Sequence, residues 1–433
     1  MSIKKENPKV DFVKNEHEIL DYWSKNKTFE KLVEKNSKGP KWSFLDGPIT
    51  ANNPMGVHHA WGRTLKDLYQ RYKSMNGHQL RYQNGFDCQG LWVEIEVEKE
   101  LGIKSKKEVE DLGIEKFVNL CKERVEKFSE VQKDQSIRLG YWMDWDNSYF
   151  TMSEENNYAI WAFLKKLYED GKIYRGTDVV PWSGRSGTSY SQMEIIEGRK
   201  LTVHKGVFVK FPLKDKENEN ILIWTTTPWT LSSNIAVAVN KKINYAKIKA
   251  NDGSIYFVAE TNLKYQRLNK EFSEKKNWVE GVPKLKTLDQ IFKERGGYEI
   301  LEIIKGEKLI GLTYQGPFDH LEPQSSKGGY PIHDTSNLQD KSAIDCHIII
   351  DGGKDSEGND MVVEGEGTGF VHMAGGCGAI DNKICKREGF VEISPIDNQA
   401  NFIQGFDFMS GLSVTDPETA QKIISNLKER DLL

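Results

Sequence analysis

Apolar residues recur at helical spacing along the first part of this chain. Between residues 14 and 36 they fall at intervals of three and four, which predicts one or two amphipathic helices. The same spacing predicts further helices over residues 58–75, 105–140 and 153–170. Short apolar runs predict strands at residues 42–45 and 79–83. The order strand, loop, helix, strand indicates the start of a parallel α/β sheet.

The pattern changes near residue 201, where β-branched runs separated by turns replace the helical spacing. Strands are predicted at residues 203–211, 221–224 and 235–239. We therefore predict three parts. Residues 1–197 form N-terminal helices and the first half of an α/β domain. Residues 198–395 form an inserted, mainly β, barrel-like domain, and residues 396–433 form a return segment with a helix from Pro417 to the end.

The length, composition and net charge of the chain exclude some classes of protein. The chain has 433 residues, enough for two or three domains with cores of their own. Aromatic residues make up 11% of it, which excludes wholesale disorder. The net charge of −4 excludes a protein that grips nucleic acid by bulk positive charge, although a local basic groove remains open.

The N-terminus and the cysteines indicate the cellular compartment in which the protein is expected. No run of about 18 apolar residues occurs, so no membrane-spanning helix is expected. The first residues lack the apolar core of a signal peptide, and we expect a cytoplasmic protein. The five cysteines are widely spaced and contain no C-x-x-C pair, which is typical of reduced thiols.

Two connections of the first α/β unit could bind ligands. The loop from Asp46 leads through two glycines to His58 and His59 at a predicted helix start, where free N–H groups favour a phosphate. The alternative is a capped helix whose histidines face solvent. Asp87 follows the second strand, at an edge where ligands bind, and could take an ammonium group. The alternative is a turn aspartate that bonds its own backbone.

Two segments of the β region carry a second candidate site. Thr225, Thr226 and Thr227 line up hydroxyls before a proline, and on a strand the first and third would share a face. Ordinary strand threonines are the alternative. His372 follows a glycine-rich turn, and another glycine-rich loop leads from it to Asp381. A lone histidine is more often structural, but the pairing of the two segments favours a site.

Five motifs in order resemble class I aminoacyl-tRNA synthetases, and among them the isoleucyl-tRNA synthetase family. The similarity covers nearly the whole chain and runs from the N-terminus of that family through its editing insertion. The motifs are DGPITANNPMGVHHAWGRTLKDLYQRY from residue 46, NGFDCQGLWVE from 84, WMDWDNSYFTM from 142, WTTTPWTLSSN from 224 and GTGFVHMA from 367.

For the first site, the resemblance implies activation of isoleucine with ATP and Mg²⁺. A family His-x-Gly-His signature aligns with Gly56-Val57-His58-His59, so His59 keeps its place while Gly56 stands where the first histidine is usual. We expect His58 to take the missing partner's place. Asp87 matches the anchor of the isoleucine α-amino group. Asp46 and Pro48 match residues of the amino-acid pocket, and Arg63, Lys66 and Glu94 are expected to be solvated charges.

For the second site, the resemblance implies hydrolytic editing of valine wrongly attached to tRNA(Ile). Asp381 matches an aspartate that holds the α-amino group of the mischarged residue. Thr227, Asn234 and His372 match residues that position the substrate and the attacking water, and Thr225 and Thr226 belong to the same motif. Some members carry zinc cysteines near the insertion; Ser183 and Ser186 stand there instead, so we predict no zinc.

The resemblance also shows what the sequence lacks. The Lys-Met-Ser-Lys-Ser loop of the family does not occur in the 433 residues, so we expect an N-terminal part of a longer or split enzyme that cannot charge tRNA alone. A second polypeptide could then carry the other catalytic half. Two other interpretations stay open: a free-standing hydrolase of mischarged tRNA, and a non-catalytic module that binds tRNA.

Overall fold

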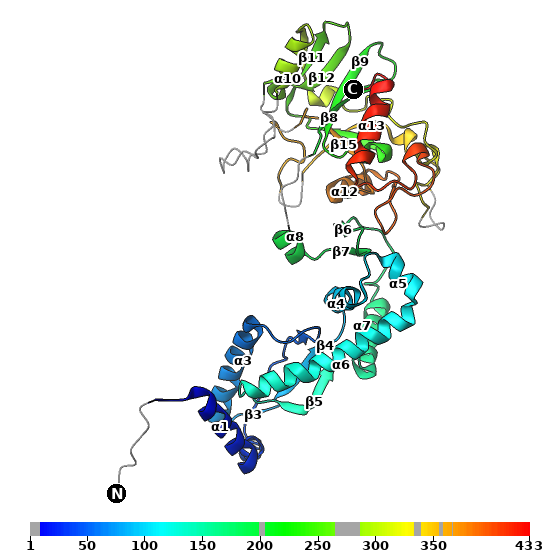
Figure 1. The fold of residues 1–433 in the computed structure, drawn as a ribbon. Coiled ribbons are helices and arrows are strands. Elements are labelled where there is room, and N and C mark those ends of the chain that lie inside the picture. Colours follow the sequence, from blue (N-terminus) through cyan, green and yellow to red (C-terminus); the bar gives the residue numbers. More distant parts are fainter. Residues whose placement is uncertain (1–8, 199–203, 265–285, 333–338, 355–357, 366) are drawn as a thin grey trace. The chain divides into compact units, whose positions relative to one another are not determined.

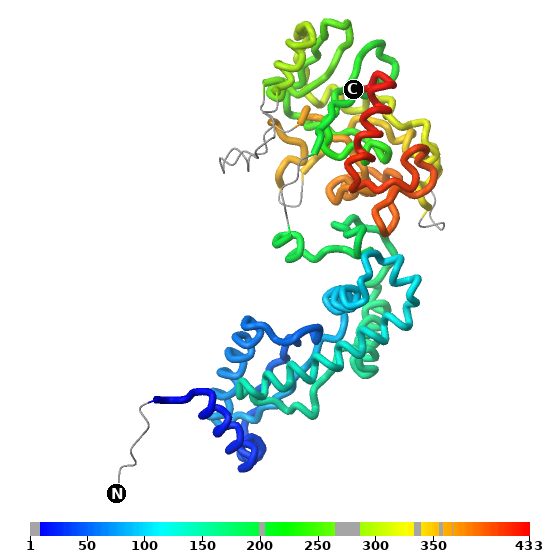
Figure 2. Tube along the Cα trace, in the orientation of Figure 1, coloured from blue at the N-terminus to red at the C-terminus, as the bar shows by residue number. Residues whose placement is uncertain are grey.

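The computed structural model describes residues 9–198, 204–264, 286–332, 339–354, 358–365 and 367–433. The chain divides after Arg175 into two compact units, here called unit 1 and unit 2. Figure 1 labels many of the helices and strands of each unit, and Figure 2 follows the same path along the Cα trace.

Unit 1 is an α/β unit with short strands. Its helices are α1 (Phe12–Asn26), α2 (Thr28–Lys35), α3 (Val57–Met75), α4 (Leu91–Leu101), α5 (Lys106–Leu112), α6 (Ile114–Arg138) and α7 (Glu154–Glu169). Its strands are β1 (Lys41–Trp42), β2 (Ile49–Thr50), β3 (Gln79–Leu80), β4 (Gln83–Asp87) and β5 (Asp144–Phe150). The helices predicted from apolar spacing are confirmed. The helix α4 was not predicted.

The parallel sheet predicted for unit 1 is confirmed, but it is split in two. Strand β1 pairs with β3, and β2, β4 and β5 form a separate parallel sheet. Tyr82 explains part of the division, because its φ of +53° turns the chain between β3 and β4. Pro48, which has no N–H to give to a ladder, likewise separates β1 from β2.

Two helices of unit 1 leave large apolar side chains in contact with solvent. On α3, Trp61 is 69% exposed and Tyr72 is 62% exposed. On α7, Trp161 is 69% and Tyr168 is 71% exposed, and no residue of that helix is buried. On α3 the exposed residues Trp61, Leu65, Leu68 and Tyr72 lie four, three and four positions apart, so they form one stripe.

Gly62, in the interior of α3, gives a prediction about stability. A Cβ built there meets no atom within 4 Å, so alanine fits without strain. We expect Gly62→Ala to raise the free energy of unfolding by about 0.5–1 kcal/mol, because glycine costs that much in a helix interior. Urea unfolding followed by circular dichroism measures this. Gly77→Ala is the matched control: its φ of +78° predicts a loss instead. An unchanged or lower midpoint for Gly62→Ala would contradict the prediction.

Unit 2 contains the predicted β region. Its strands are β6 (Trp182–Ser183), β7 (Thr188–Ser189), β8 (Val207–Pro212), β9 (Glu219–Thr225), β10 (Ala236–Val239), β11 (Asn244–Ala250), β12 (Ile255–Ala259), β13 (Tyr298–Lys305), β14 (Ile349–Asp351) and β15 (Val371–Met373). Its helices are α8 (Gln192–Gly198), α10 (Leu288–Glu294), α11 (Glu322–Ser325), α12 (Ala379–Glu388) and α13 (Pro417–Glu429). Short 3₁₀ turns are η1 (Pro228–Ser233), η2 (Glu260–Leu263), η3 (Gly306–Lys308), η4 (Ile344–Cys346) and η5 (Asp407–Met409). Val203, the first residue of one predicted strand, lies outside the described residues.

The barrel-like closure expected for this region is corrected by the strand order. Five strands run β13-β11-β12-β9-β8, and a separate sheet runs β14-β10-β15. In the described parts of unit 2 the larger sheet keeps two edges, so it does not close. The chain leaves β9 through η1 and starts the second sheet at β10, because the Thr-Pro turn at 227–228 interrupts the strand.

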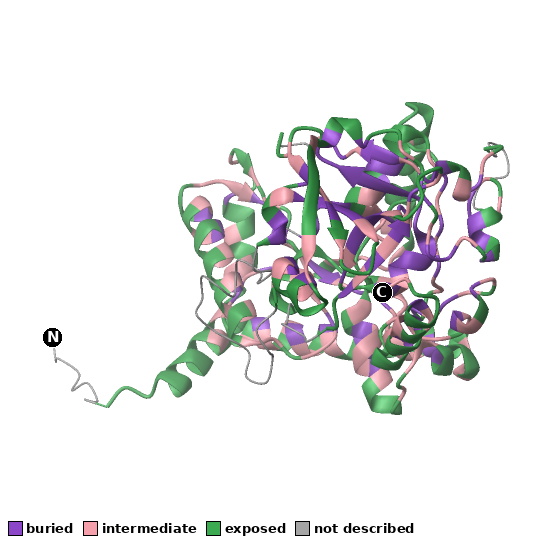
Figure 3. Cartoon of the chain, turned by 90° about the horizontal axis from the view of Figure 1, so that it is seen from above, coloured by how far each residue is buried: buried purple, intermediate pink, exposed green. Residues whose placement is uncertain are grey.

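The five-stranded and three-stranded sheets of unit 2 share one core, and β6 and β7 form a separate two-stranded sheet. Val209 and Ile223 from the larger sheet and Val237 from the smaller are fully buried in the same apolar cluster. The segment after residue 395 joins this core through Ile423 and Leu427 of α13. Figure 3 shows buried residues gathered in the strands of unit 2, whereas α1 of unit 1 has none. None of the described helices is long and apolar enough to cross a membrane.

Candidate functional sites

Asp87 lies at the carboxyl end of β4 and is held by two hydroxyls. Thr50, its register partner on β2, donates from Oγ1 to Asp87 Oδ2 at 2.9 Å. Thr151, just after β5, donates to Oδ1 at 3.5 Å. The carboxylate is partly exposed and stays within reach of a cation. Neither threonine was predicted, and the parallel register that places Thr50 beside Asp87 was the missing signal.

Tyr149 packs its ring against β4, the strand that ends at Asp87, and bonds the backbone of Asp46. Tyr149 donates its hydroxyl to the carbonyl oxygen of Asp46 at 2.8 Å. Its ring lies over Gly85, where an added Cβ would come within 2.2 Å of Cζ. Burial raises the pKa of Tyr149, and the negative charges of Asp46 and Asp87 add to this. The hydroxyl therefore stays protonated and remains a donor.

Of the charges predicted to be solvated, Arg63 is buried and Lys66 is partly buried beside Asp46, which was predicted to line the amino-acid pocket. The Asp46 carboxylate is 2% exposed and forms an ion pair with Lys66, so it faces α3. Pro48, two residues on, is partly exposed. Arg63 is also 2% exposed and donates to Asn84 Oδ1 at 3.1 Å, with its guanidinium 5.2 Å from the Tyr141 ring centre. The expectation of a solvated Arg63 is wrong, because aromatic rings cover it.

The two histidines at the start of α3 lie against each other, with ring centres 3.8 Å apart. His59 Nδ1 accepts from the N–H of Gly56 at 3.2 Å, which caps the helix. An added Cβ on Gly56 would lie 2.9 Å from His58 Cε1, so the His58 ring fills the space beside residue 56. That His58 takes over the role of the missing family histidine stays a prediction.

Protonation of His59 follows from its contacts. Burial lowers its pKa, and the neighbouring His58 and Arg63 lower it further. The ring is therefore neutral at pH 7. Because Nδ1 accepts a hydrogen bond, we assign the proton to Nε2. That N–H can be donated to a phosphate oxygen.

In unit 2 a chain of hydroxyls leads from β9 to His372. Thr225 Oγ1 lies 3.3 Å from Thr227 Oγ1, which lies 3.5 Å from Thr230 Oγ1. Thr230 Oγ1 lies 3.0 Å from Nε2 of His372 on β15. Thr226 is exposed beside them. Thr225 and Thr227 come together across a turn and not along one strand face, because β9 ends at Thr225.

Thr230, which the sequence did not predict as a member of this chain of hydroxyls, determines which nitrogen of His372 carries the proton. Thr230 donates to the carbonyl of Thr227 at 2.9 Å, so its oxygen accepts from His372 Nε2–H. Burial lowers the pKa of His372 to about 4, and the ring is neutral. Nδ1 then carries a lone pair, and among the described residues it has no partner. This nitrogen is buried, and the chain of hydroxyls from Thr227 meets the ring at Nε2, through Thr230.

Asp381 lies in the first turn of α12 and braces the loop before it. Its Oδ2 accepts from the N–H of Ala374 at 3.0 Å, and burial raises its pKa to about 6. Cys377 lies within that loop. Burial raises the pKa of its thiol, the charge of Asp381 raises it further, and a hydrogen bond with the Ser233 hydroxyl lowers it. Ser233 belongs to η1, so the Asp381 loop faces the threonine-bearing turn.

Asn234 was expected beside the substrate, but its amide is used inside the core. It is 1% exposed, donates to the Ala236 carbonyl at 3.1 Å and accepts from the Tyr314 hydroxyl at 2.7 Å. The structure therefore brings Asn234 to Tyr314 and not to His372. No group of three or more His, Cys, Asp or Glu side chains that could hold a metal gathers in the described ranges.

A family model and curated relatives both show similarity of this chain to tRNA synthetases. The family model of the class I tRNA synthetases (I, L, M and V) matches residues 18–299. An isoleucine–tRNA ligase of Clostridium tetani is 34% identical over 430 residues, 99% of this chain and 36% of the relative. One from Sulfolobus acidocaldarius is 34% identical over 428 residues, 98% of this chain and 36% of the relative. The chain thus spans about a third of the length of these relatives. The crystal structure of GlLeuRS-CP1 covers 53% of this chain and 97% of its own, with 11% identity and a TM-score of 0.33.

Proposed function

From the premise that this chain belongs to the class I tRNA synthetases, we propose that it carries the amino-acid and phosphate side of an isoleucine–tRNA ligase together with its editing site. The proposed substrates are isoleucine, ATP and tRNA(Ile), and the proposed compartment is the cytoplasm. The observation that carries the editing part is the hydroxyl chain that ends at a neutral His372 near the Asp381 loop.

For activation we propose that Asp87 binds the α-ammonium group of isoleucine, oriented by the hydroxyls of Thr50 and Thr151. A carboxylate oxygen of isoleucine attacks the α-phosphate of ATP, and pyrophosphate leaves. His59 Nε2–H and the adjacent His58 ring donate to phosphate oxygens. Mg²⁺ would arrive with ATP, and this scheme gives it no protein ligand among the described residues.

For editing we propose that Asp381 binds the α-ammonium group of valine esterified to tRNA(Ile). Thr227, whose hydroxyl is held through Thr230 by His372, binds a water, which attacks the ester carbonyl. The ester bond breaks, valine leaves, and the ribose hydroxyl takes a proton. With a pKa of about 4, His372 is a weak base, so its proposed role is to fix Thr230 and, through it, the Thr227 hydroxyl that orients the water. A second site of this kind is needed because one methylene distinguishes valine from isoleucine by only about 1–3 kcal/mol, a magnitude already established for isoleucine enzymes of this family.

The rest of the catalytic machinery is proposed to come from sequence equivalent to the remaining length of the relatives, in the same or a second polypeptide. Unit 2 contains Thr227, His372 and Asp381 around one core, which favours a second candidate function: hydrolysis by this chain without activation.

One experiment tests which reactions this chain carries out by itself. The purified chain is mixed with [¹⁴C]valyl-tRNA(Ile), and release of valine is compared with the spontaneous rate; isoleucine-dependent ATP–pyrophosphate exchange is measured in parallel. We expect hydrolysis without exchange, and we expect Asp87→Ala to leave hydrolysis unchanged. Exchange by the chain alone would overturn the need for a second catalytic half. Salt-dependent tRNA binding without either reaction would leave only a binding module.

A further inference from the structure

One face of α6 holds the loop that leads into the proposed phosphate site. Gln132 donates from Nε2 to the carbonyl of Thr50 at 2.9 Å and to that of Asn53 at 2.8 Å. One turn further, Gln135 Oε1 accepts from the N–H of Met55 at 2.7 Å. Gln132 is 1% exposed, so these bonds are shielded from water. The backbone of residues 50–55 is thus fixed by side chains from a helix about 80 residues later in the chain.

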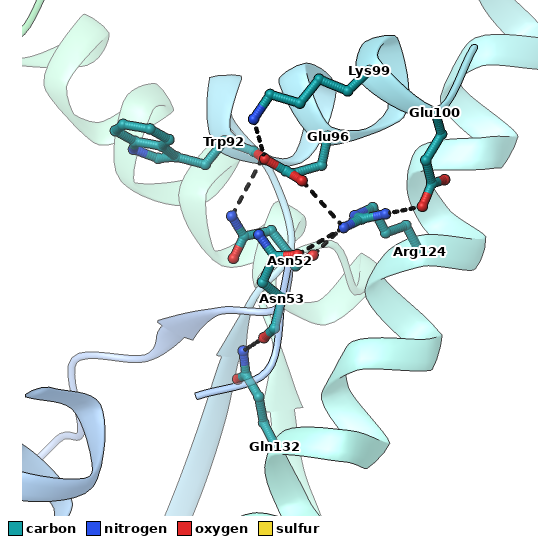
Figure 4. A network of polar contacts seen from close by, with 8 residues as sticks. All are labelled: Asn52, Asn53, Trp92, Glu96, Lys99, Glu100, Arg124 and Gln132. Carbon is teal, nitrogen blue, oxygen red and sulfur yellow. Dashed lines mark hydrogen bonds and ion pairs between the residues drawn. The ribbon is translucent and has the colours of Figure 1, made fainter. Parts of the chain in front are cut away.

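Arg124 extends the same face of α6 and adds a second attachment. Figure 4 shows its guanidinium between the loop and α4. Nε donates to the carbonyl of Asn52 at 2.9 Å, and Nη2 donates to Asn53 Oδ1 at 2.8 Å. The same group forms ion pairs with Glu96 and Glu100 of α4. Since α4 follows Asp87 by four residues, Arg124 joins the two connections that carry the proposed ligand groups.

The position of the loop between two ligand groups gives these contacts a role. At its start, Thr50 bonds Asp87, the proposed ammonium anchor. At its end, Gly56 and His59 form the proposed phosphate site. The distance between the two sites therefore depends on the shape of residues 50–56, which Arg124 and Gln132 fix. These two residues lie eight positions apart, so they share one face of the helix.

We propose that Gln132 and Gln135, on the face of α6 that Arg124 extends, are positioning residues that set the spacing between the ammonium and phosphate sites, an inference that rests on the proposed activation function. A ligand that touches both sites needs that spacing, whereas isoleucine needs only the Asp87 end. Loosening the loop therefore weakens a bridging ligand more than isoleucine itself. General loss of structure would weaken both alike.

The test uses Gln132→Met, which keeps the side-chain volume and removes both donors. Its matched control is Asp134→Asn, an exposed position on the same helix. Gln135→Met is a second variant, which removes only the acceptor for Met55 and so keeps the test valid if Gln132→Met folds poorly. Hydrogen exchange by mass spectrometry reports on peptides covering residues 50–56. Saturation-transfer NMR titrations measure binding of isoleucine and of 5′-O-(N-isoleucylsulfamoyl)adenosine, which spans both sites.

We expect faster exchange of the loop in both methionine variants and no change in the control. Affinity for the sulfamoyl analogue should fall about tenfold or more, because misplacement by about 1 Å costs that much in similar sites, while affinity for isoleucine changes less than about twofold. Equal losses for both ligands, or a loosened loop with unchanged analogue binding, would overturn the positioning role. A wild-type chain that binds neither ligand would overturn the proposed activation function and the positioning role with it. Unchanged hydrogen exchange of residues 50–56 in both methionine variants would overturn the positioning role alone.

Discussion

Replacing Asp381 by asparagine is expected to lower the hydrolysis of valyl-tRNA(Ile) by about 100-fold or more, because the variant cannot pair its side chain with the α-ammonium group of the substrate. The amide keeps the size of the side chain and can still accept from the Ala374 N–H, so the loop before α12 keeps its shape. Glu388→Gln, an exposed change at the far end of the same helix, is the control and should leave the rate unaltered.

The same substitution should not destabilise the protein. Burial raises the pKa of Asp381 to about 6, so folding favours the protonated carboxyl. A raised carboxyl pKa means that stability is lost as pH rises from the unfolded value through about 6, and the whole cost is present at pH 7. Asparagine carries no charge, and we expect its free energy of unfolding at pH 7 to equal or exceed that of the wild type by about 1–3 kcal/mol. A variant that loses activity because it unfolds would contradict this account.

The pH profile gives an independent measure of the role of Asp381. Binding of an ammonium group requires the carboxylate form, so kcat/KM for hydrolysis should rise with pH along a limb centred near pH 6. The limb should be absent from the residual activity of Asp381→Asn. A wild-type rate that stays flat between about pH 5 and 8 would rule out this role for Asp381.

Gly376→Ala is expected to have the largest effect on stability. A Cβ at this position would lie 2.0 Å from the carbonyl oxygen of Ile393 and 3.0 Å from Cα of Ser394. Both neighbours are backbone atoms, so relief requires the loop at 374–378 or the segment at 393–394 to move. We expect a loss of about 2–4 kcal/mol from unit 2.

Denaturant unfolding of this variant should show a lower midpoint for unit 2, and the native fraction should hydrolyse valyl-tRNA(Ile) slowly because Asp381 is attached to the displaced loop. The comparison is Gly62→Ala, the same chemical change in open space, for which a gain is expected. Equal midpoints for the two alanine variants would show that the loop adapts without cost.

Local patterns predicted what depends on local physics. Helical spacing predicted α3 and α6, and the strand ends predicted where Asp87 would lie, because periodicity and turn residues act within a few positions. The resemblance named His59, His372 and Asp381, whose roles remain proposals.

The rest depends on pairings that no single segment contains. Thr50 lies beside Asp87 because their strands pair in a parallel register. Thr230 bonds His372 although the two are 142 positions apart in the sequence. Arg63 looked solvated because its burial comes from aromatic rings near residues 141 and 145. The open edges of the larger sheet are β13 and β8, a strand order that strand propensity does not determine.

The uncovered apolar stripe on α3 has a practical consequence for colloidal behaviour. Trp61 and Tyr72 face solvent together with Leu68, which is 62% exposed. Soluble monomers rarely display such continuous patches. At high concentration, copies of the purified chain should adhere to one another and to chaperones, and a fluorescent dye such as ANS should brighten on the native protein. Handling conditions, and not only catalysis, therefore depend on the outer face of one helix.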